Sequence, residues 1–201
     1  QAASGSQFFL LTLVPIHDKG YINCYARDET RRYLLTRQLT YQARHDSLTG
    51  LINRREFIRK LNLVLRRIHD QGGEHALLYL DMEHFKEVND AVGHLAGDQV
   101  LQEFSNMLLN EVKDGDVLSR IGGDEYAMLV YNVTPEQARS VGKRLSRAVA
   151  KKAFRWHGNE YSLGVTVGIA MLQHDKLGDA EELLMRADSA CYAAKELGGG
   201  E

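Results

Sequence analysis

The chain has 201 residues, 44% of them hydrophobic and 26% charged, with a formal net charge of −2. This length suits one complete domain with part of a second, and the near balance of charge argues against a nucleic-acid-binding surface that depends on bulk positive charge. Cys24 and Cys191 lie far apart and form no C-x-x-C pattern, which excludes a disulfide framework and a zinc site. The apolar runs are too short to span a bilayer and no signal peptide begins the chain, so we expect a cytoplasmic protein or the cytoplasmic part of a membrane-anchored one.

The first 28 residues contain two β-prone runs. Residues 8–14 and 21–26 are rich in aromatic and β-branched side chains, and the loop His17–Gly20 ends in a glycine suited to a turn. These runs predict a hairpin, which needs more sheet to pack against because two strands alone are marginal in water. We expect residues 1–28 to be the C-terminal strands of a truncated domain. A hairpin that packs on the main domain is the alternative.

Residues 29–45 are predicted to form a linker helix. Asp28 or Thr30 can cap a helix that runs from Arg31 to about His45 without an internal glycine or proline. Large side chains follow a loose three-and-four spacing, at Tyr33, Leu34, Leu39 and Tyr41. Such a row packs against its own domain or, because the segment joins two domains, pairs with a second copy in a short coiled coil.

The main domain, residues 46–201, begins with a helix and a central strand. Gly50 ends the linker helix, and the next helix runs to about Asp70. Its apolar residues recur at helical spacing, at Phe57, Leu61, Val64, Leu65 and Ile68. The nearly continuous apolar run Ala76–Leu80 is typical of a strand covered on both faces, and we expect it to stop at Asp81.

The rest of the domain alternates helices with strands. A strand-to-helix transition covers residues 82–90, and Gly93 and Gly97 interrupt the chain before a helix over residues 98–112. Pro135 begins a helix that we expect to run through about Phe154, and the last helix covers residues 180–197. Residues 161–172 are β-prone. This order predicts an α/β or α+β fold in which helices flank a central sheet.

One further hairpin carries two acidic residues. Strand-like runs cover residues 117–121 and 126–131, and Gly122-Gly123 between them reads as a two-residue turn, because such turns need positive φ. The turn places Asp124 and Glu125 at its edge. An ordinary surface hairpin with acidic residues for solubility is the alternative interpretation.

If the strand that ends at Asp81 is a neighbour of this hairpin, three carboxylates converge there. Carboxylates at such short distances raise one another's pKa, because their negative charges repel. A hard divalent cation bound between them removes this repulsion. Mg²⁺ accepts few protein carboxylates and takes further ligands from phosphates, and two such ions can assist a phosphoryl displacement. The free N–H groups of residues 83–86 and the charge of Lys86 suit a phosphate chain. No P-loop motif is present.

Five motifs together resemble a known family. They are D-x-L-T-G-L-x-N-R-R at Asp46–Arg55, D-x-x-x-F-K-x-x-N-D at Asp81–Asp90, G-H-x-x-G-D at Gly93–Asp98, R-x-G-G-D-E at Arg120–Glu125 and Y-x-A-K at Tyr192–Lys195. In this order they resemble the GGDEF domain of the diguanylate cyclase family. The resemblance implies a mainly antiparallel sheet flanked by helices, similar to the palm of polymerases and class III nucleotide cyclases. It also implies the condensation of two GTP into cyclic di-GMP with release of pyrophosphate, with Mg²⁺ or Mn²⁺ as cofactor and one GTP per domain of a dimer.

The resemblance assigns a role to each matching residue. The metal ligands are the side chains of Asp81 and Asp124, with Glu125 as a further candidate, and the carbonyl of Met82. Asp124, or else Glu125, helps to deprotonate the attacking 3′-hydroxyl. Phe85, Lys86 and Lys195 hold the phosphates. Asn89 and Asp98 read guanine, with His94 beside them. A carboxylate suits guanine, because adenine offers an acceptor at N1 where guanine offers a donor.

The chain departs from the family pattern at three places. Tyr126 replaces a Phe, which should cost little if its hydroxyl finds a partner. The R-x-x-D of the family's inhibitory product site falls on Lys113 and Asp116, and lysine lacks the planar fork that grips guanine. Gly199 stands where the family usually has an Arg. These changes keep an alternative open, a catalytically weak GTP-binding domain that controls a cyclic di-GMP phosphodiesterase (EAL) domain beyond residue 201.

The residues from Val14 to Thr30, V-P-I-H-D-K-G-Y-I-N-C-Y-A-R-D-E-T, carry a second resemblance, to the last two strands of a PAS sensor domain. It implies control by a PAS sensor and a homodimer formed through the linker helix and the PAS-like region. Arg120 is as compatible with a structural as with a functional role. The histidines apart from His94 show no metal-ligand spacing, and we expect them at the surface.

Overall fold

The computed structural model describes residues 6–16, 20–174 and 178–197. The chain divides into two compact units, Gln1–Arg44 and His45–Glu201. None of the helices in the described ranges combines the length and apolar character needed to cross a membrane. Gly199 and residues 17–19 of the predicted loop lie outside the described residues.

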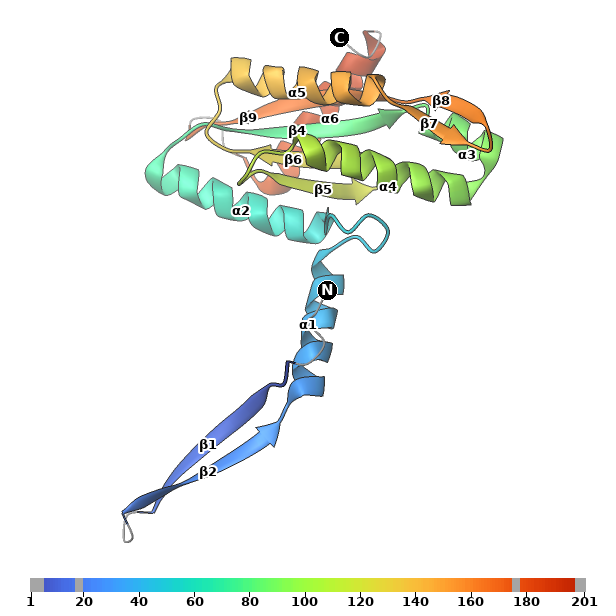
Figure 1. Ribbon diagram of the computed structural model, residues 1–201. Helices are drawn as coiled ribbons and strands as arrows, with labels where there is room; N and C mark the ends of the chain where they lie inside the picture. Colours follow the sequence, from blue (N-terminus) through green and yellow to red (C-terminus); the bar gives the residue numbers. More distant parts are fainter. Residues whose placement is uncertain (1–5, 17–19, 175–177, 198–201) are drawn as a thin grey trace. The chain divides into compact units, whose positions relative to one another are not determined.

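The first unit is a hairpin followed by a helix, as predicted. Strands β1 (Phe9–Ile16) and β2 (Tyr21–Asp28) pair antiparallel, and α1 spans Thr30–Arg44 (Figure 1). The carboxylate of Asp28 accepts a hydrogen bond of 2.8 Å from the backbone N–H of Thr30, which caps the start of the helix. No residue of α1 is buried, so the row of large side chains on this helix has no core within the unit.

The second unit is built on a five-stranded sheet with the order β3-β5-β6-β4-β9. The central strand β4 pairs antiparallel with both neighbours, and only β3 pairs in parallel, with β5. The mainly antiparallel sheet is therefore confirmed. The strand bounds are β3 Ile52–Asn53, β4 His75–Glu83, β5 Val117–Gly122, β6 Glu125–Val130 and β9 Gly164–Leu172.

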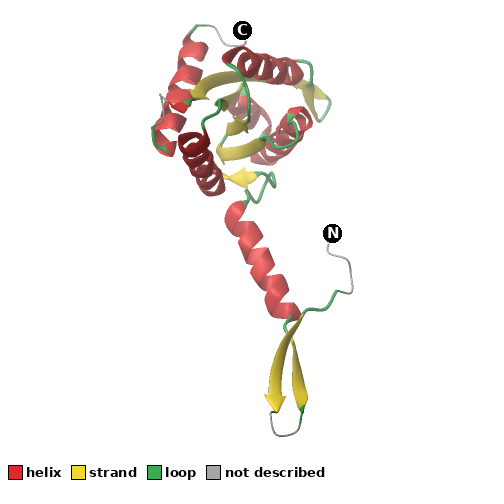
Figure 2. Cartoon of the chain, turned by 90° about the vertical axis from the view of Figure 1, so that its left-hand side faces the viewer, coloured by secondary structure: helices red, strands yellow, loops and turns green. Residues whose placement is uncertain are grey.

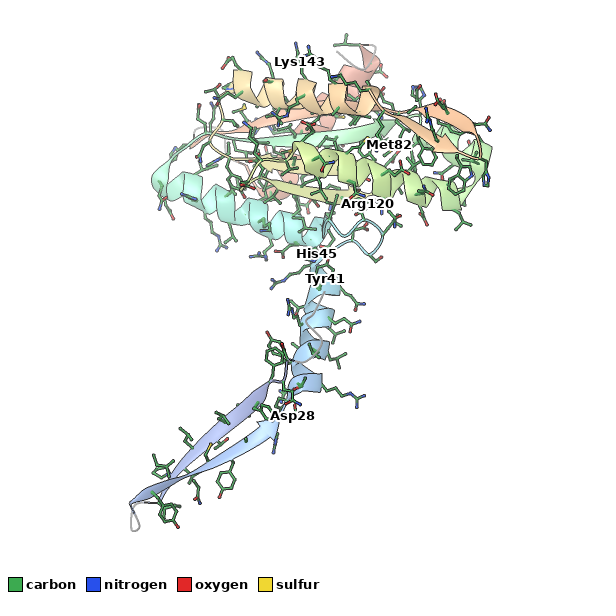
Figure 3. The ribbon with its side chains drawn as sticks, viewed as in Figure 1. Asp28, Tyr41, His45, Met82, Arg120 and Lys143 are labelled. Atoms are coloured by element: carbon green, nitrogen blue, oxygen red, sulfur yellow. The ribbon has the colours of Figure 1, made fainter. Side chains whose placement is uncertain are left out.

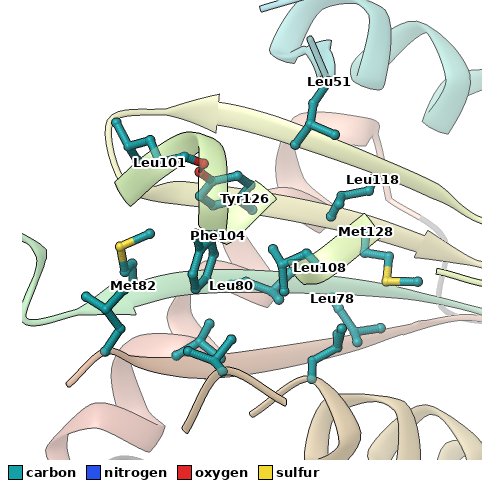
Figure 4. Close-up of a cluster of buried hydrophobic side chains, with 14 of the residues drawn as sticks. Leu51, Leu78, Leu80, Met82, Leu101, Phe104, Leu108, Leu118, Tyr126 and Met128 are labelled. Atoms are coloured by element: carbon teal, nitrogen blue, oxygen red, sulfur yellow. Dashed lines mark hydrogen bonds between the residues drawn. The ribbon is translucent and has the colours of Figure 1, made fainter. Parts of the chain in front are cut away.

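Helices cover both faces of this sheet (Figures 1 and 2). Side chains alternate along β4, so Leu78 and Leu80 join a core with α4 and α5, whereas Leu77 joins a second core with α2 and α6. Figure 4 shows part of the first core. The expectation of a central strand buried on both faces is confirmed. The helix bounds are α2 Arg54–Gln71, α3 Phe85–Val92, α4 His94–Glu111, α5 Pro135–Ala150 and α6 Ala180–Glu196.

The predicted extension of α5 to Phe154 is wrong. The helix ends at Ala150, and Phe154 belongs to β7 (Ala153–Trp156), which pairs with β8 (Asn159–Ser162). His157 and Gly158 form the turn between these strands, with φ of 48° and 84°. Positive φ at both positions is what a tight primed turn requires. Phe154 is buried because it reaches the first core from this extra hairpin.

Three other boundaries differ from the prediction. Strand β4 continues two residues past Asp81 to Glu83, and α4 begins at His94 with Gly97 inside it. The turn residues between β5 and β6 are Gly123 and Asp124, because an irregularity between Arg120 and Gly122 shifts the register.

The expectation that His75 lies at the surface is wrong. His75 is buried, and its Nδ1 accepts a 3.0 Å hydrogen bond from the N–H of Asn132.

Candidate functional site

The structure places the predicted acidic residues side by side. Asp81 of β4 faces Glu125 of β6 in the antiparallel register, and the N–H of Met82 donates a 3.2 Å hydrogen bond to the carbonyl of Asp124. Neighbouring strands lie about 5 Å apart, so the three carboxylates share one end of the sheet. The expectation that the strand of Asp81 lies next to the acidic hairpin is confirmed.

Arg120 fixes the turn that carries Asp124. Its Nε donates to the carbonyl of Gly123 at 2.9 Å, and its Nη1 lies 3.0 Å from Oδ1 of Asp46 (Figure 3). Asp46 also accepts from the N–H and hydroxyl of Thr49, at 2.9 and 2.7 Å. Although burial opposes ionisation of Asp46, the hydrogen bonds from Thr49 and Arg120 hold its pKa below the ordinary value. Arg120 is therefore a structural link between two of the motifs.

An open pocket of about 640 Å³, here called the β4–α3 pocket, lies beside these carboxylates. Six of the residues predicted to bind metal or phosphate line it: Asp81, Met82, Phe85, Lys86, Asp124 and Lys195. They come from β4, α3, the β5–β6 turn and α6, so the fold gathers them from separate parts of the sequence. The volume is within the range of small-molecule sites.

Lys195 supplies a positive charge to this acidic group. Its Nζ lies 2.5 Å from Oδ1 of Asp81. Burial disfavours the charged ammonium, but the hydrogen bond and charge of Asp81 outweigh it and raise the pKa of Lys195 above its ordinary value. Lys195 therefore remains protonated at neutral pH.

The carboxyl group of Glu125 has a raised pKa. Burial raises its pKa, and a hydrogen bond from the hydroxyl of Tyr79 partly opposes this rise. The charges of Asp81, Asp188 and Asp124 raise it further. A carboxyl group whose pKa is raised by burial and by several acidic neighbours is typical of functional sites.

The start of α3 contributes backbone groups to the pocket. The helix begins at Phe85, after His84, which has a left-handed φ of 64° and makes no side-chain capping bond. Without such a cap, the N–H groups of the first turn and the positive end of the helix dipole are available to an anion. Glu83 is the last strand residue, so the N–H groups that serve this purpose begin two residues later than predicted.

The predicted guanine-reading residues lie elsewhere, along α3 and the start of α4. Asn89, His94 and Asp98 do not line the β4–α3 pocket. Asn89 is half-buried, and its side chain lies so close to Gly97 that a Cβ at Gly97 would stand 2.0 Å from the Asn89 Oδ1. The glycine of the G-H-x-x-G-D motif is thus a packing requirement, and Asp98 follows it directly.

The predicted inhibitory positions lie in the loop between α4 and β5. Lys113 is exposed, and its carbonyl accepts a 3.0 Å hydrogen bond from the N–H of Asp116. The carboxylate of Asp116 accepts a 3.1 Å hydrogen bond from the N–H of Tyr131. Asp116 therefore has a structural role in joining this loop to the end of β6.

Tyr126, which stands in place of the family's Phe, is fully buried with its hydroxyl satisfied. Tyr126 and Leu101 are labelled in Figure 4. The Tyr126 hydroxyl donates to the Leu101 carbonyl at 3.3 Å and accepts from the Ser105 hydroxyl at 3.2 Å. Burial raises the pKa of Tyr126 to about 12. The expected partner for this hydroxyl is confirmed.

Sequence reasoning missed three residues of this region. Glu83 lines the β4–α3 pocket and accepts a short hydrogen bond from the Thr166 hydroxyl, while Tyr79 and Asp188 surround Glu125. Residues 79, 81 and 83 share one face of β4, so a period of two through Asp81 is the signal that could have found Tyr79 and Glu83. Asp188 could not be found without knowing where α6 packs.

Among the residues that the structure describes, no three His, Cys, Asp or Glu side chains are grouped so as to hold a metal ion. The side chains alone therefore form no closed metal cage. The oxygen donors that are present, carboxylates and a backbone carbonyl, are of the type that Mg²⁺ and Mn²⁺ prefer, and Mg²⁺ at nucleotide sites is held by one or two carboxylates with substrate phosphates.

Comparison with known proteins agrees with this geometry. A family model described as "Diguanylate cyclase, GGDEF domain" matches residues 43–201. The chain is 38% identical over 174 residues to the "Probable diguanylate cyclase DgcE" of Escherichia coli, a match that covers 87% of this chain and 16% of that protein. It is 34% identical over 172 residues to the "Cyclic di-GMP phosphodiesterase PdeB" of Shewanella oneidensis, covering 86% of this chain and 20% of that protein.

A solved structure shows the same fold. The coiled coil and GGDEF domain of DgcB from Caulobacter crescentus, in complex with c-di-GMP, superimposes with a TM-score of 0.79 at 25% sequence identity. The match covers 85% of this chain and 90% of that one. The chain spans less than a quarter of both curated relatives, so it corresponds to one part of such proteins.

Proposed function

The chain belongs to the GGDEF family of diguanylate cyclases, and from that membership we propose that it condenses two GTP molecules into cyclic di-GMP with release of pyrophosphate. The observation that carries the proposal is the arrangement of Asp81, Asp124 and Lys195 around one pocket, next to the start of α3. This pocket combines carboxylates that can bind a metal ion with a cation and free N–H groups that can bind phosphate. A nucleoside triphosphate with its metal ion requires all three.

We propose that Asp81, Asp124 and the Met82 carbonyl hold Mg²⁺ or Mn²⁺, with Glu125 as a further ligand. When bound, such an ion neutralises phosphate charge and lowers the pKa of a coordinated hydroxyl. The pair formed by the Met82 N–H and the Asp124 carbonyl keeps the two carboxylates in register. The proposal fits the donor set, which consists of hard oxygen atoms.

The remaining groups have separate tasks in the proposed reaction. Asp124, or alternatively Glu125 with its raised pKa, accepts the proton of the attacking 3′-hydroxyl. The N–H groups at Phe85 and Lys86 bind the phosphates, and Lys195 adds a charge from α6. Asn89 and Asp98, with His94 beside them, read the guanine base.

The reaction needs two GTP molecules, one on each of two domains, so we propose that the protein acts as a homodimer through α1 and the hairpin. The exposed side chains of Tyr33, Leu34 and Leu39 on α1 offer an apolar surface for pairing. The related DgcB structure contains a coiled coil with its GGDEF domain.

We propose further that β1 and β2 are the closing strands of a PAS-like sensor that controls α1. The hairpin exposes large apolar residues, including Leu10, Leu11, Leu13 and Ile22, as expected of strands taken from a larger sheet. Thr30 ties the two elements together, because its hydroxyl accepts a 2.9 Å hydrogen bond from the N–H of Phe8, whose ring stacks on Tyr33.

A regulatory domain that binds GTP without efficient turnover is the second candidate. The phosphodiesterase name of the PdeB relative favours it, because that protein contains a region similar to this chain. In this case the domain would control an adjacent EAL domain. The β4–α3 pocket would still bind the triphosphate.

The test incubates the purified protein with GTP and Mg²⁺ and measures cyclic di-GMP by chromatography. We expect product from the native chain and a loss of at least about 100-fold in Asp124→Asn, with little change in the matched control Asp70→Asn at the far end of α2. GTP binding without product would favour the regulatory domain. Equal activity in Asp124→Asn would refute the roles assigned here.

A further inference from the structure

The outward face of α5 carries a row of cations that the proposed reaction does not use. Arg139, Lys143 and Arg147 recur at every fourth residue of the helix, and Lys151, its C-cap residue, continues the spacing; all four are exposed. At a rise of 1.5 Å per residue, neighbours in this row are about 6 Å apart along the helix. We call these four residues the basic stripe; Lys143 is labelled in Figure 3.

Acidic side chains balance the basic stripe only in part. The pKa of Glu136 is lowered by its own backbone N–H and the Thr134 hydroxyl, and the charge of Arg139 lowers it further. None of its four members forms an ion pair with a carboxylate within the described ranges. Arg144 on the same helix differs, because its Nε lies 3.0 Å from Oε2 of Glu111. Like charges four residues apart destabilise a helix, so the stripe has a cost that ordinary surface solvation does not explain.

The helix tolerates this repulsion because other features stabilise it. Thr134 and Gln137 form a capping box at its start, and Ala138, Val141, Leu145 and Val149 bury its opposite face. The stripe can therefore be retained for a purpose other than stability.

The surroundings of the stripe indicate what kind of partner it suits. It borders an open hollow of about 870 Å³, in which basic side chains outnumber the two acidic ones. The rest of the lining is Glu111, Glu136, Ser140, Arg144 and Ala148. None of the large apolar side chains that are exposed in the described chain lies on α5. Stable protein interfaces depend on aromatic or aliphatic anchors at their centre, and this surface has none. A partner that needs only charge fits better.

We propose that the basic stripe docks the domain on a lipid bilayer that carries anionic phosphate headgroups. Residues four apart on an α-helix turn by about 40°, so the stripe winds through roughly 120° from Arg139 to Lys151. Its long side chains can still reach toward one plane, and mobile headgroups can adjust to them. Clusters of four to eight Lys or Arg bind anionic bilayers in this way, with about a fivefold gain in binding for each cation near the surface. Binding is expected to fall steeply with salt.

The experiment measures sedimentation of the full chain with vesicles of phosphatidylcholine that contain about 30% phosphatidylglycerol, over a range of salt concentrations. We expect binding at low salt that is lost at high salt. The variant Lys143→Gln/Arg147→Gln should bind roughly 25-fold more weakly, since each cation contributes about fivefold. The matched control Lys60→Gln/Arg66→Gln removes the same charge from α2 and should retain most of the binding.

Three results would overturn the proposal. Equal losses in the two variants would show that net charge, and not the stripe, governs binding. Equal binding to pure phosphatidylcholine would assign it to the apolar hairpin β1–β2. Tighter binding to a DNA duplex than to the vesicles, with the same sensitivity to Lys143→Gln/Arg147→Gln, would identify a nucleic-acid surface instead. Circular dichroism of each variant verifies that α5 still folds.

Discussion

Lys195 places its ammonium nitrogen 2.5 Å from the carboxylate of Asp81, although the two residues lie in the last helix and the central strand. Both residues line the β4–α3 pocket, and the contact offsets part of its negative charge. The ammonium group of Lys195 is suited to exchange the Asp81 carboxylate for a substrate phosphate, because both offer anionic oxygens that accept charge-assisted hydrogen bonds.

Replacing Lys195 should weaken the use of GTP. Lys195→Ala removes one charge-assisted contact, so kcat/KM for GTP should fall by about 10- to 100-fold, mainly through a higher KM. Lys143→Ala, which removes an exposed lysine from α5, is the matched control and should leave the kinetics in solution unchanged. A normal KM in Lys195→Ala would show that this ammonium does not contact the substrate.

Removing the charge of Glu125 should stabilise the protein near neutral pH. The raised pKa means that the contribution of Glu125 to stability is fully present below the pKa of the unfolded chain and is lost as pH rises through the folded pKa. Glu125→Gln removes this penalty, so the Tm should rise by about 1 to 3 °C at pH 7 and should not rise at pH 4. Glu103→Gln on α4 serves as the control. The same gain at both pH values would contradict the electrostatic explanation.

The link between Arg120 and Asp46 should be visible as a coupling energy. Each of Arg120→Ala and Asp46→Asn is expected to cost about 1.5–3 kcal/mol of unfolding free energy, because both remove charge-assisted hydrogen bonds in a partly buried site. The double variant should cost less than the sum. Additive losses in urea unfolding would show that the two side chains act independently.

Gly97 should matter for base selectivity. In Gly97→Ala the new methyl group displaces the Asn89 side chain, so selectivity for GTP over ATP should fall by about tenfold while the helix stays folded. Asn89→Ala should produce the same loss, and the double variant should lose no more than either single one. Unchanged selectivity in Gly97→Ala would remove Asn89 from the proposed base-reading pair.

Tyr126→Phe should be nearly neutral. In the variant the Ser105 hydroxyl is free to donate to the Leu101 carbonyl, 2.7 Å away, so no buried acceptor loses its last partner. We expect a change of less than about 1 kcal/mol in unfolding free energy, against roughly 3–5 kcal/mol for Tyr126→Ala, which leaves a cavity. A large loss in Tyr126→Phe would mean that the hydroxyl positions the hairpin.

The sequence predicted those parts of the fold in which one periodicity dominates. The apolar run of β4 and the helical spacing in α2 are unambiguous, and both elements were confirmed. The prediction of a helix break at Gly97 was wrong, because this glycine lies inside α4 and makes room for the Asn89 side chain. The helix was predicted to reach Phe154 because no glycine or proline follows Leu145 before that residue, but Phe154 already belongs to the hairpin β7–β8.

The sequence predicted the acidic residues of the candidate site but not the side chains that surround them. The convergence of the three carboxylates was predicted on the condition that the strand of Asp81 lies beside the acidic hairpin, and the pairing of β4 with β6 meets this condition. Of the partners of Glu125, Tyr79 could have been found from the period of two through Asp81, whereas Asp188 depends on how α6 packs, which no local pattern encodes. The proposed metal and substrate roles stay predictions.

The most direct test of the central claim is a crystal structure with Mn²⁺ and a non-hydrolysable GTP analogue, read by anomalous scattering. We predict an anomalous peak between the carboxylates of Asp81 and Asp124, with the triphosphate over the first turn of α3. A peak away from both carboxylates, or a triphosphate outside the β4–α3 pocket, would contradict the account.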